Sequence, residues 1–177
     1  EGARLVINDL DAGPANETAE AVRAMGAEAV VCAGSVTEVG FAERFIKTGV
    51  DSFGGLDIIV NNAGYTWDSV VQKMSDEQWQ AIIDVHLTAP FKILRAAQPV
   101  ISAKAKEEAA AGQEVFRKVV NISSIAGTGG NAGQINYSAA KAGILGVTRT
   151  MAKEWGRYKV NVNAVAFGPI RTRLTEG

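Results

Sequence analysis

The feature of this sequence that most restricts its fold is a regular alternation of short apolar runs with longer segments of helical character. Runs with the length and composition of buried strands occupy 3–9, 27–33, 56–64, 116–124 and 159–168. Segments with apolar residues at helical spacing, or rich in small residues, lie between them at 16–26, 36–54, 75–112 and 135–156. This alternation predicts an α/β fold, a doubly wound parallel sheet with helices on both faces.

Local signals mark the ends of some of these helices. Ser75 and Gln78 have the spacing of a capping box, which predicts a helix start there. Gly26 follows the last residue of the first helical pattern and is a typical stop. Pro90 and Pro99 fall inside the 75–112 segment, where a proline bends or ends a helix.

The totals exclude several classes of protein. The chain has 177 residues, of which 47% are apolar and 21% are charged. We therefore expect one folded domain over 1–177. A net charge of −1 gives no reason to expect a nucleic-acid partner.

The sequence also argues against a membrane-spanning protein and against a protein held together by disulfides. No apolar stretch approaches the length of roughly 20 residues that spans a bilayer. The single cysteine, Cys32, cannot form an intramolecular disulfide. These features predict a cytoplasmic protein without a membrane segment, and we predict no metal site.

Polar residues and glycines lie at the carboxyl end of every predicted strand or directly after it. In a parallel sheet these positions share one edge, where ligands of open α/β sheets bind. Each alone has a structural explanation as a cap or a turn, but together they predict a ligand crevice. The positions are Asn8 and Asp9, Gly34 to Val36, Asn61 to Gly64, Ser123 and Ser124, and Gly168 and Pro169.

Asp9 is the most informative of these residues for binding. A carboxylate at the end of an early strand accepts hydrogen bonds from both hydroxyls of an adenosine ribose. The same charge repels a 2′-phosphate. The structural alternative is that Asp9 caps the helix that follows.

Tyr137 and Lys141 form the candidate chemical pair. Their spacing of four places both side chains on one helix face. A nearby ammonium favours the phenolate form of a tyrosine, so that it can exchange a proton near neutral pH. Ser124 ends the preceding strand, and its hydroxyl is placed to hydrogen-bond and orient the substrate oxygen with which Tyr137 would exchange a proton. A tyrosine and lysine at this spacing also occur by chance, so the argument depends on the combination.

The chain resembles the short-chain dehydrogenase/reductase family in four motifs: "NNAG" (61–64), "NISS" (121–124), "YSAAK" (137–141) and "FGPIRT" (167–172). The resemblance implies a Rossmann-type fold and NAD(P)-dependent interconversion of an alcohol and a carbonyl. It makes Tyr137 the general acid/base, Lys141 its activator and a ribose ligand, and Ser124 the residue that positions the substrate. The residues it places along the cofactor are Asp9, Ser35, Val36, Asn61, Ala63, Gly64, Ile122, Tyr137, Lys141, Gly168, Pro169 and Thr172.

The sequence departs from the family pattern in three respects. It begins where the second strand of the family begins, without the glycine-rich phosphate loop, and it stops before the last strand, so we expect a chain truncated at both ends. The absent first strand is central in the family's sheet, and its loss would leave unpaired strand edges. His86 stands at the position of the family's catalytic asparagine, with a plain structural histidine as the alternative. Ser35 replaces an aspartate that contacts adenine.

The resulting hypothesis is an oxidoreductase that uses NAD in preference to NADP. Its substrate would be a small molecule with a secondary alcohol or ketone, such as a 3-oxoacyl or 3-hydroxyacyl thioester. The alternative is a non-catalytic nucleotide-binding or regulatory module of the same fold. By likeness to the family we expect a homodimer or homotetramer.

Overall fold

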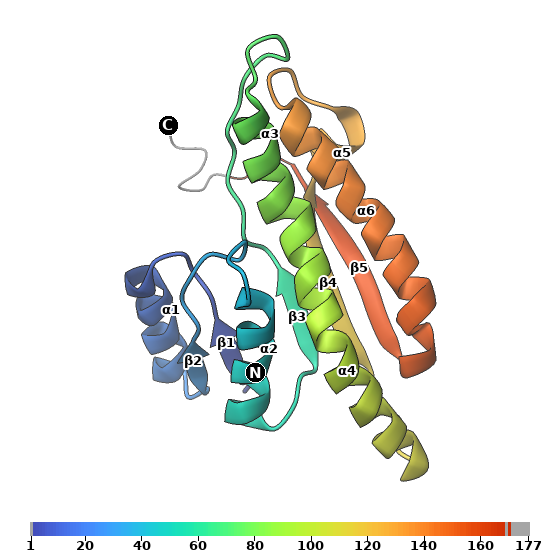
Figure 1. Cartoon of the computed structure of the whole chain (residues 1–177). Coiled ribbons are helices and arrows are strands. Elements are labelled where there is room, and N and C mark those ends of the chain that lie inside the picture. Colours follow the sequence, from blue (N-terminus) through green and yellow to red (C-terminus); the bar gives the residue numbers. More distant parts are fainter. Residues whose placement is uncertain (1, 169, 171–177) are drawn as a thin grey trace.

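The computed structural model describes residues 2–168 and 170, and their order of elements follows the predicted alternation (Figure 1). The strands are β1 (Leu5–Ile7), β2 (Ala29–Val31), β3 (Ile58–Asn61), β4 (Arg117–Ser124) and β5 (Val160–Phe167). The helices are α1 (Ala12–Ala24), α2 (Phe41–Phe53), α3 (Asp76–Ile83), α4 (Ala89–Ala110), α5 (Ile125–Gly129) and α6 (Ile135–Trp155). A π-helical turn (Asp84–Thr88) joins α3 to α4, and a 3₁₀ turn (Gly156–Tyr158) follows α6.

All strand pairs among the described residues are parallel, which confirms the predicted fold class. They form two separate sheets, β1–β2 and β3–β4–β5, and no ladder joins β1 to β3 in this part of the chain. One edge of each of these two strands therefore has no strand partner among the described residues. The predicted single sheet is interrupted at this point, where the chain, having run outward from β1 to β2, turns back to β3 (Figure 1).

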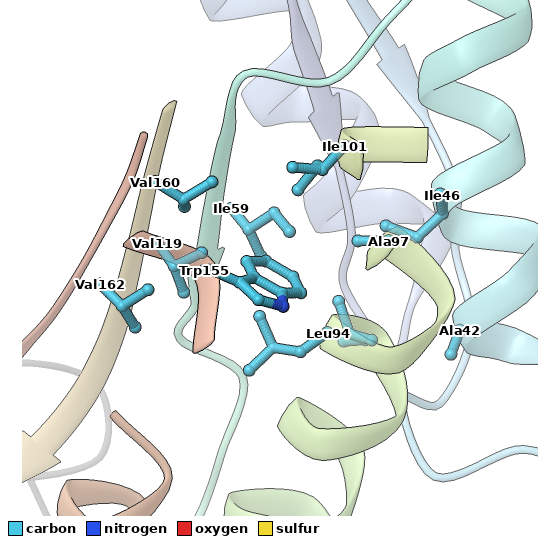
Figure 2. Packing of buried hydrophobic residues seen from close by; sticks show 11 residues of the cluster. Ala42, Ile46, Ile59, Leu94, Ala97, Ile101, Val119, Trp155, Val160 and Val162 are labelled. Carbon is cyan, nitrogen blue, oxygen red and sulfur yellow. The ribbon is translucent and has the colours of Figure 1, made fainter. Parts of the chain in front are cut away.

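The main hydrophobic core lies between the three-stranded sheet and helices α2, α4 and α6 (Figure 2). Alternate residues of β4 are buried, with Val119 fully inaccessible, which is the period-two pattern of a strand that packs one face against helices. Leu94 and Ala97 of α4 and Trp155 at the end of α6 fill the layer above it. This layer holds the long helix α6, and therefore Tyr137 and Lys141, against the end of β4.

The long helical stretch predicted over 75–112 is present as α3, a π-helical turn and α4, which follow one another without a break from Asp76 to Ala110. Ser75 does form the predicted capping box with Gln78, but the helix passes through a π-helical turn before Pro90. Because Pro90 has no N–H, it cannot donate to the carbonyl of His86. The bonding shifts to Ala89 N–H donating to Asp84 O, five residues back, which is the bond of a π-helix. Pro99 lies within α4 without ending it.

Other element bounds also differ from the prediction. The strands of the first pair have only three residues each, and α1 begins at Ala12, before the predicted 16–26 segment. Helix α2 begins at Phe41 rather than within 36–40. The short helix α5 was not predicted, because glycines recur through it and after it and glycine is a poor helix former. Within residues 2–168, no helix is long and apolar enough to cross a membrane.

Candidate active site

A cavity of about 770 Å³ lies at the carboxyl ends of the strands, where the β1 side of the molecule faces β3. This is the point at which strand order reverses, the usual ligand site of open α/β sheets. The cavity brings together most of the residues that the sequence singled out. Those that line it are Asp9, Ser35, Val36, Asn61, Ala63, Gly64, His86, Ile122, Tyr137 and Lys141.

The remaining candidates lie elsewhere. Ser124 and Gly168, at the ends of β4 and β5, do not line this cavity. Pro169 and Thr172 fall outside the residues that the structure describes. The description of the candidate site therefore covers the residues from Asp9 to Lys141 and leaves out Pro169 and Thr172.

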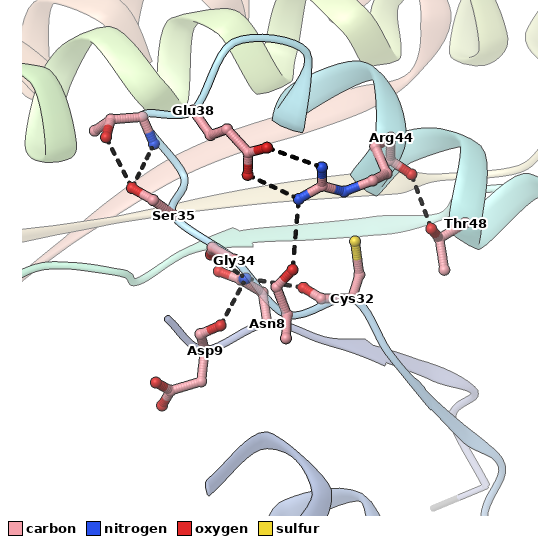
Figure 3. A network of polar contacts seen from close by, with 10 residues as sticks. Asn8, Asp9, Cys32, Gly34, Ser35, Glu38, Arg44 and Thr48 are labelled. Atoms are coloured by element: carbon pink, nitrogen blue, oxygen red, sulfur yellow. Dashed lines mark hydrogen bonds and ion pairs between the residues drawn. The ribbon is translucent and has the colours of Figure 1, made fainter. Parts of the chain in front are cut away.

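The Asp9 end of the cavity is held by the side chain of Asn8 (Figure 3). The Asn8 amide donates to the carbonyls of Asp9, Cys32 and Gly34 at 3.2, 2.9 and 2.9 Å, and Gly34 N–H donates to Asp9 O at 3.0 Å. These bonds tie the end of β1 to the end of β2. The Asp9 carboxylate accepts one bond, from Asp11 N–H at 3.2 Å. Asp11, and not Asp9, is the N-cap of α1, so the capping alternative does not account for Asp9.

The loop after β2 is fixed by an ion pair beside it. Arg44 of α2 donates to both carboxylate oxygens of Glu38, at 3.0 and 3.3 Å (Figure 3). A Cβ on Gly34 would lie 2.8 Å from the Arg44 guanidinium, and the backbone of Gly34 has a φ of +134°. Only glycine suits this position, because it has no Cβ and adopts a positive φ freely. Ser35 turns its hydroxyl toward Thr37, with 2.8 Å between the two hydroxyl oxygens.

Two asparagines join the end of β3 to the middle of β4. Asn61 donates to Asn121 Oδ1 at 2.8 Å, and Asn121 donates in turn to the Thr148 hydroxyl of α6 at 2.9 Å. Asn121 is completely buried. A buried amide that both accepts and donates a hydrogen bond fixes the relative position of its two partners. The cavity wall at Asn61 is therefore connected, through Asn121, to the helix that carries Tyr137.

Tyr137 and Lys141 share one face of α6, as their spacing predicts. The Lys141 ammonium donates to Ile122 O at 2.6 Å and lies 5.5 Å from the centre of the Tyr137 ring. Lys141 is 4% exposed, and this burial lowers the pKa of its ammonium to about 8, because a charge is less stable away from water. At neutral pH the group is therefore charged in most molecules, and it places a cation beside the tyrosine.

His86 packs edge-on against Tyr137, with 5.0 Å between the ring centres. Its Nε2 lies 2.7 Å from Tyr65 O. Since a carbonyl only accepts, Nε2 carries the hydrogen. Burial and, secondly, the Lys141 charge lower the pKa of His86 to about 4, so the ring is neutral. A Cβ on Gly64 would lie 2.0 Å from His86 Cε1, which explains the glycine of "NNAG" in this chain.

Two serines and a glycine connect β4 to α6. Ser123 Oγ donates to Lys141 O at 2.7 Å. Ser124 Oγ accepts from Ala126 N–H at 3.1 Å and so caps α5, which leaves its hydroxyl hydrogen available. Gly127 lies so close to α6 that a Cβ there would be 2.5 Å from the backbone carbon of Lys141. This contact fixes the distance between α5 and the residue that carries the ammonium.

The comparisons with known proteins identify the family. All of the chain, residues 1–177, matches the family model described as short chain dehydrogenase. The chain belongs to this family. It is 39% identical over 176 residues to a 3-oxoacyl-[acyl-carrier-protein] reductase of Synechocystis, and 44% identical over 169 residues to the hydroxyacyl-CoA dehydrogenase ChsB1 of Mycobacterium tuberculosis. The family and these names support an oxidoreductase, and the resemblance stated from the sequence is confirmed.

Solved structures give the same fold. A short chain dehydrogenase from Mycobacterium avium superposes with a TM-score of 0.87 at 40% identity, over 99% of this chain and 62% of that one. A gluconate 5-dehydrogenase from Burkholderia cenocepacia, in complex with NADP and tartrate, superposes with a TM-score of 0.86 at 26% identity, over 99% of this chain and 65% of that one. The matches with the Synechocystis and M. tuberculosis enzymes cover 99% and 93% of this chain, and 67% and 52% of theirs.

Sequence reasoning missed several residues that hold the site. Asn8 was seen only as a strand-end residue, and Asn121, Ser123 and Asn136 were given no role of their own. Three of them, Asn121, Ser123 and Asn136, are at most 2% exposed and hydrogen-bonded. The available signal was a polar residue at a position that the pattern predicts to be buried, since such a residue needs a specific partner.

Proposed function

We propose that this protein interconverts a secondary alcohol and a ketone with a nicotinamide dinucleotide, NAD in preference to NADP. The observation that carries the proposal is that Tyr137 and Lys141 line one cavity together with Asp9. The volume of this cavity, about 770 Å³, is in the usual range for a small-molecule or cofactor site. Intact Tyr137 and Lys141 favour an enzyme over a non-catalytic nucleotide-binding module.

The residues of the cavity fit the dinucleotide in chemical terms. Asp9 offers a carboxylate to a ribose diol, and only one of its oxygens accepts a backbone bond. Lys141 has one bond to a protein carbonyl, that of Ile122, and further N–H groups that can donate to a second ribose. Asn61, Ala63 and Gly64 form the wall between these two ends. When bound, the dinucleotide would supply or accept the hydride.

Tyr137 performs the proton transfer in this proposal. Its hydroxyl gives a proton to the substrate oxygen when a ketone is reduced, and takes it back when an alcohol is oxidised. The Lys141 charge favours the phenolate that remains after the proton has left. The free hydroxyl hydrogen of Ser124 is proposed to bond the substrate oxygen and orient it. His86 keeps the ring of Tyr137 in place through edge-to-face packing.

The substrate class follows from the relatives. The Synechocystis enzyme is named for 3-oxoacyl groups and the M. tuberculosis enzyme for hydroxyacyl-CoA. We therefore propose a 3-oxoacyl or 3-hydroxyacyl thioester as substrate. A homodimer or homotetramer and a cytoplasmic location stay predictions.

The first test is the binding of NADH and NADPH, compared side by side by nicotinamide fluorescence. We expect tighter binding of NADH, because the Asp9 carboxylate repels a 2′-phosphate. Asp9→Ala is expected to raise the affinity for NADPH by about tenfold, or about 1.4 kcal/mol. Unchanged discrimination in this variant would exclude Asp9 as the residue that reads the ribose.

The second test is turnover of a 3-oxoacyl thioester with NADH. Tyr137→Phe removes the hydroxyl group that transfers the proton and keeps the ring, so we expect turnover to fall by about 100-fold or more while NADH affinity stays within about twofold. Equal turnover in the two proteins would show that Tyr137 does not transfer the proton.

A further inference from the structure

The residue before Tyr137 is an asparagine that sequence reasoning left without a role. Asn136 is completely inaccessible to solvent. Its amide group donates to Trp67 O at 3.2 Å and to Gln78 O at 3.1 Å, and its Oδ1 accepts from Tyr137 N–H at 2.8 Å. One side chain thus joins three parts of the molecule: the segment after β3, helix α3 and the first turn of α6.

The bond to Tyr137 N–H replaces one that the helix cannot make. Tyr137 is the third residue of α6, so its N–H is one of the first-turn donors that have no acceptor within the helix, and Gly133 O, four residues back, lies outside it. Here Gly133 O accepts from Ser69 N–H at 2.8 Å instead, and Ser69 forms a parallel bridge with Gln134. Without Asn136 Oδ1, the partly buried backbone N–H of Tyr137 would lose its partner at the start of α6, and the loss of such a bond costs on the order of 1 kcal/mol.

The segment after β3, which contains Trp67 and Ser69, also forms part of the cavity wall. Tyr65 and Thr66 line the cavity. His86 holds the carbonyl of Tyr65 on one side of Thr66, and Asn136 holds the carbonyl of Trp67 on the other. The wall is therefore attached at two points, to the side chain that packs on the Tyr137 ring and to the residue that bonds the Tyr137 backbone.

We propose that Asn136 is a positioning residue, which fixes Tyr137 at a set distance from the cavity wall at Tyr65 and Thr66. This inference rests on the proposed function, in which the Tyr137 hydroxyl must reach the substrate oxygen that Ser124 orients. A displacement of about 1 Å between reacting groups costs a factor of about 100 in rate. The hydrogen bonds of Asn136 prevent such a displacement at the start of α6, where helix ends fray most readily.

The test uses two substitutions at this position and a matched control. Asn136→Ala removes all three bonds. Asn136→Asp keeps the acceptor for Tyr137 N–H but loses both donors. Gln134→Ala is the control, because Gln134 bonds Asp68 at 2.8 Å and so links the same two segments through an exposed contact.

We expect both Asn136 variants to lower kcat by about 10- to 100-fold per NADH-binding site, with the dissociation constant for NADH within about twofold of wild type. The control is expected to stay within about twofold in both quantities. A merely structural role would lower the melting temperature and the fraction of folded protein without changing kcat per binding site. Folded Asn136 variants with wild-type kcat would overturn the proposal.

Amide hydrogen exchange in the wild-type protein gives a readout that needs no activity. The Tyr137 amide is expected to exchange as slowly as that of Ser138, whose N–H donates to Gln134 O at 2.7 Å. Fast exchange at Tyr137 alone would overturn the proposal even if no Asn136 variant folds. A wild-type protein that binds NADH but turns over no thioester would refute the proposed thioester substrate and leave the exchange result to decide on Asn136.

Discussion

At the scale of single residues, His86 shows how burial decides a protonation state. Its Nε2–H is bonded to Tyr65 O, and its Nδ1 is buried without a hydrogen-bond partner among the described residues. A proton on Nδ1 would add a charge near the Lys141 ammonium in a site shielded from solvent. The ring is therefore neutral in the folded protein, and protonation of His86 at low pH should lower the free energy of unfolding.

The pH dependence of stability tests this assignment. The pKa of His86 is about 4 in the folded protein, against 6.5 for an unperturbed histidine. The unfolded state therefore binds more protons as the pH falls from the unperturbed to the folded value, and the free energy of unfolding should fall over this range by about 3 kcal/mol. Urea denaturation at about pH 7 and about pH 4.5 measures the loss, and His86→Asn should reduce it.

The comparison with His86→Asn isolates the histidine. Glu38 and Glu108 also have lowered pKa values, because each is bonded to an arginine. Their protonation destabilises both proteins alike below about pH 4.5. An equal loss in the two proteins would show that His86 is not the group that titrates.

At the scale of elements, the approach of α5 to α6 depends on one glycine. A Cβ on Gly127 would meet the backbone of Lys141 and Ala142 at 2.5 to 2.8 Å, and a helix backbone does not yield as a flexible side chain does. We expect Gly127→Ala to cost about 1–3 kcal/mol of stability and to lower turnover, since it moves Lys141. Gly129→Ala is the control, because nothing lies within 4 Å of that position.

Thermal unfolding and kcat, measured on both alanine variants, check this prediction. Gly129→Ala should leave both quantities close to wild type, since alanine is also the better helix former. Gly127→Ala with wild-type stability would show that α5 moves freely away from α6, and the contact would then have no role in placing Lys141.

The elements also show what the sequence could and could not predict. The alternation of strands and helices was predictable, because each element has its own hydrophobic period. The π-helical turn before Pro90 was not predictable, because the hydrophobic pattern does not show that Ala89 N–H bonds the carbonyl five residues back instead of four. Cavity residues such as Asp9 and Lys141 were found through the rule for strand ends and through helical spacing. Asn136 was missed, because its partners include segments far apart in the sequence.

At the scale of the whole molecule, the two sheets differ in how much they bury. The large core residues come from α2, β3, α4, β4, α6 and β5. The buried residues of α1 and β2 are small: Ala15, Ala19 and Ala29. Because burial of apolar area is the main source of stability, the β1–β2 part should open more easily than the three-stranded sheet.

Native-state hydrogen exchange with and without NADH tests this difference and connects it to function. The Cys32 amide donates to Ile7 O, next to the β1–β2 pair, and the Lys118 amide of the central strand β4 donates to Asp57 O, just before β3. We expect the free energy of the opening that exposes the Cys32 amide to be at least about 2 kcal/mol lower than that of the opening that exposes the Lys118 amide. A ligand that contacts both Asp9 and Lys141 binds only the closed form, so NADH at about 100 times its dissociation constant should raise the opening free energy at Cys32 by about 2.7 kcal/mol. If Cys32 exchanges at the same rate with saturating NADH, the bound dinucleotide does not reach Asp9, and the β1–β2 pair has no part in holding it.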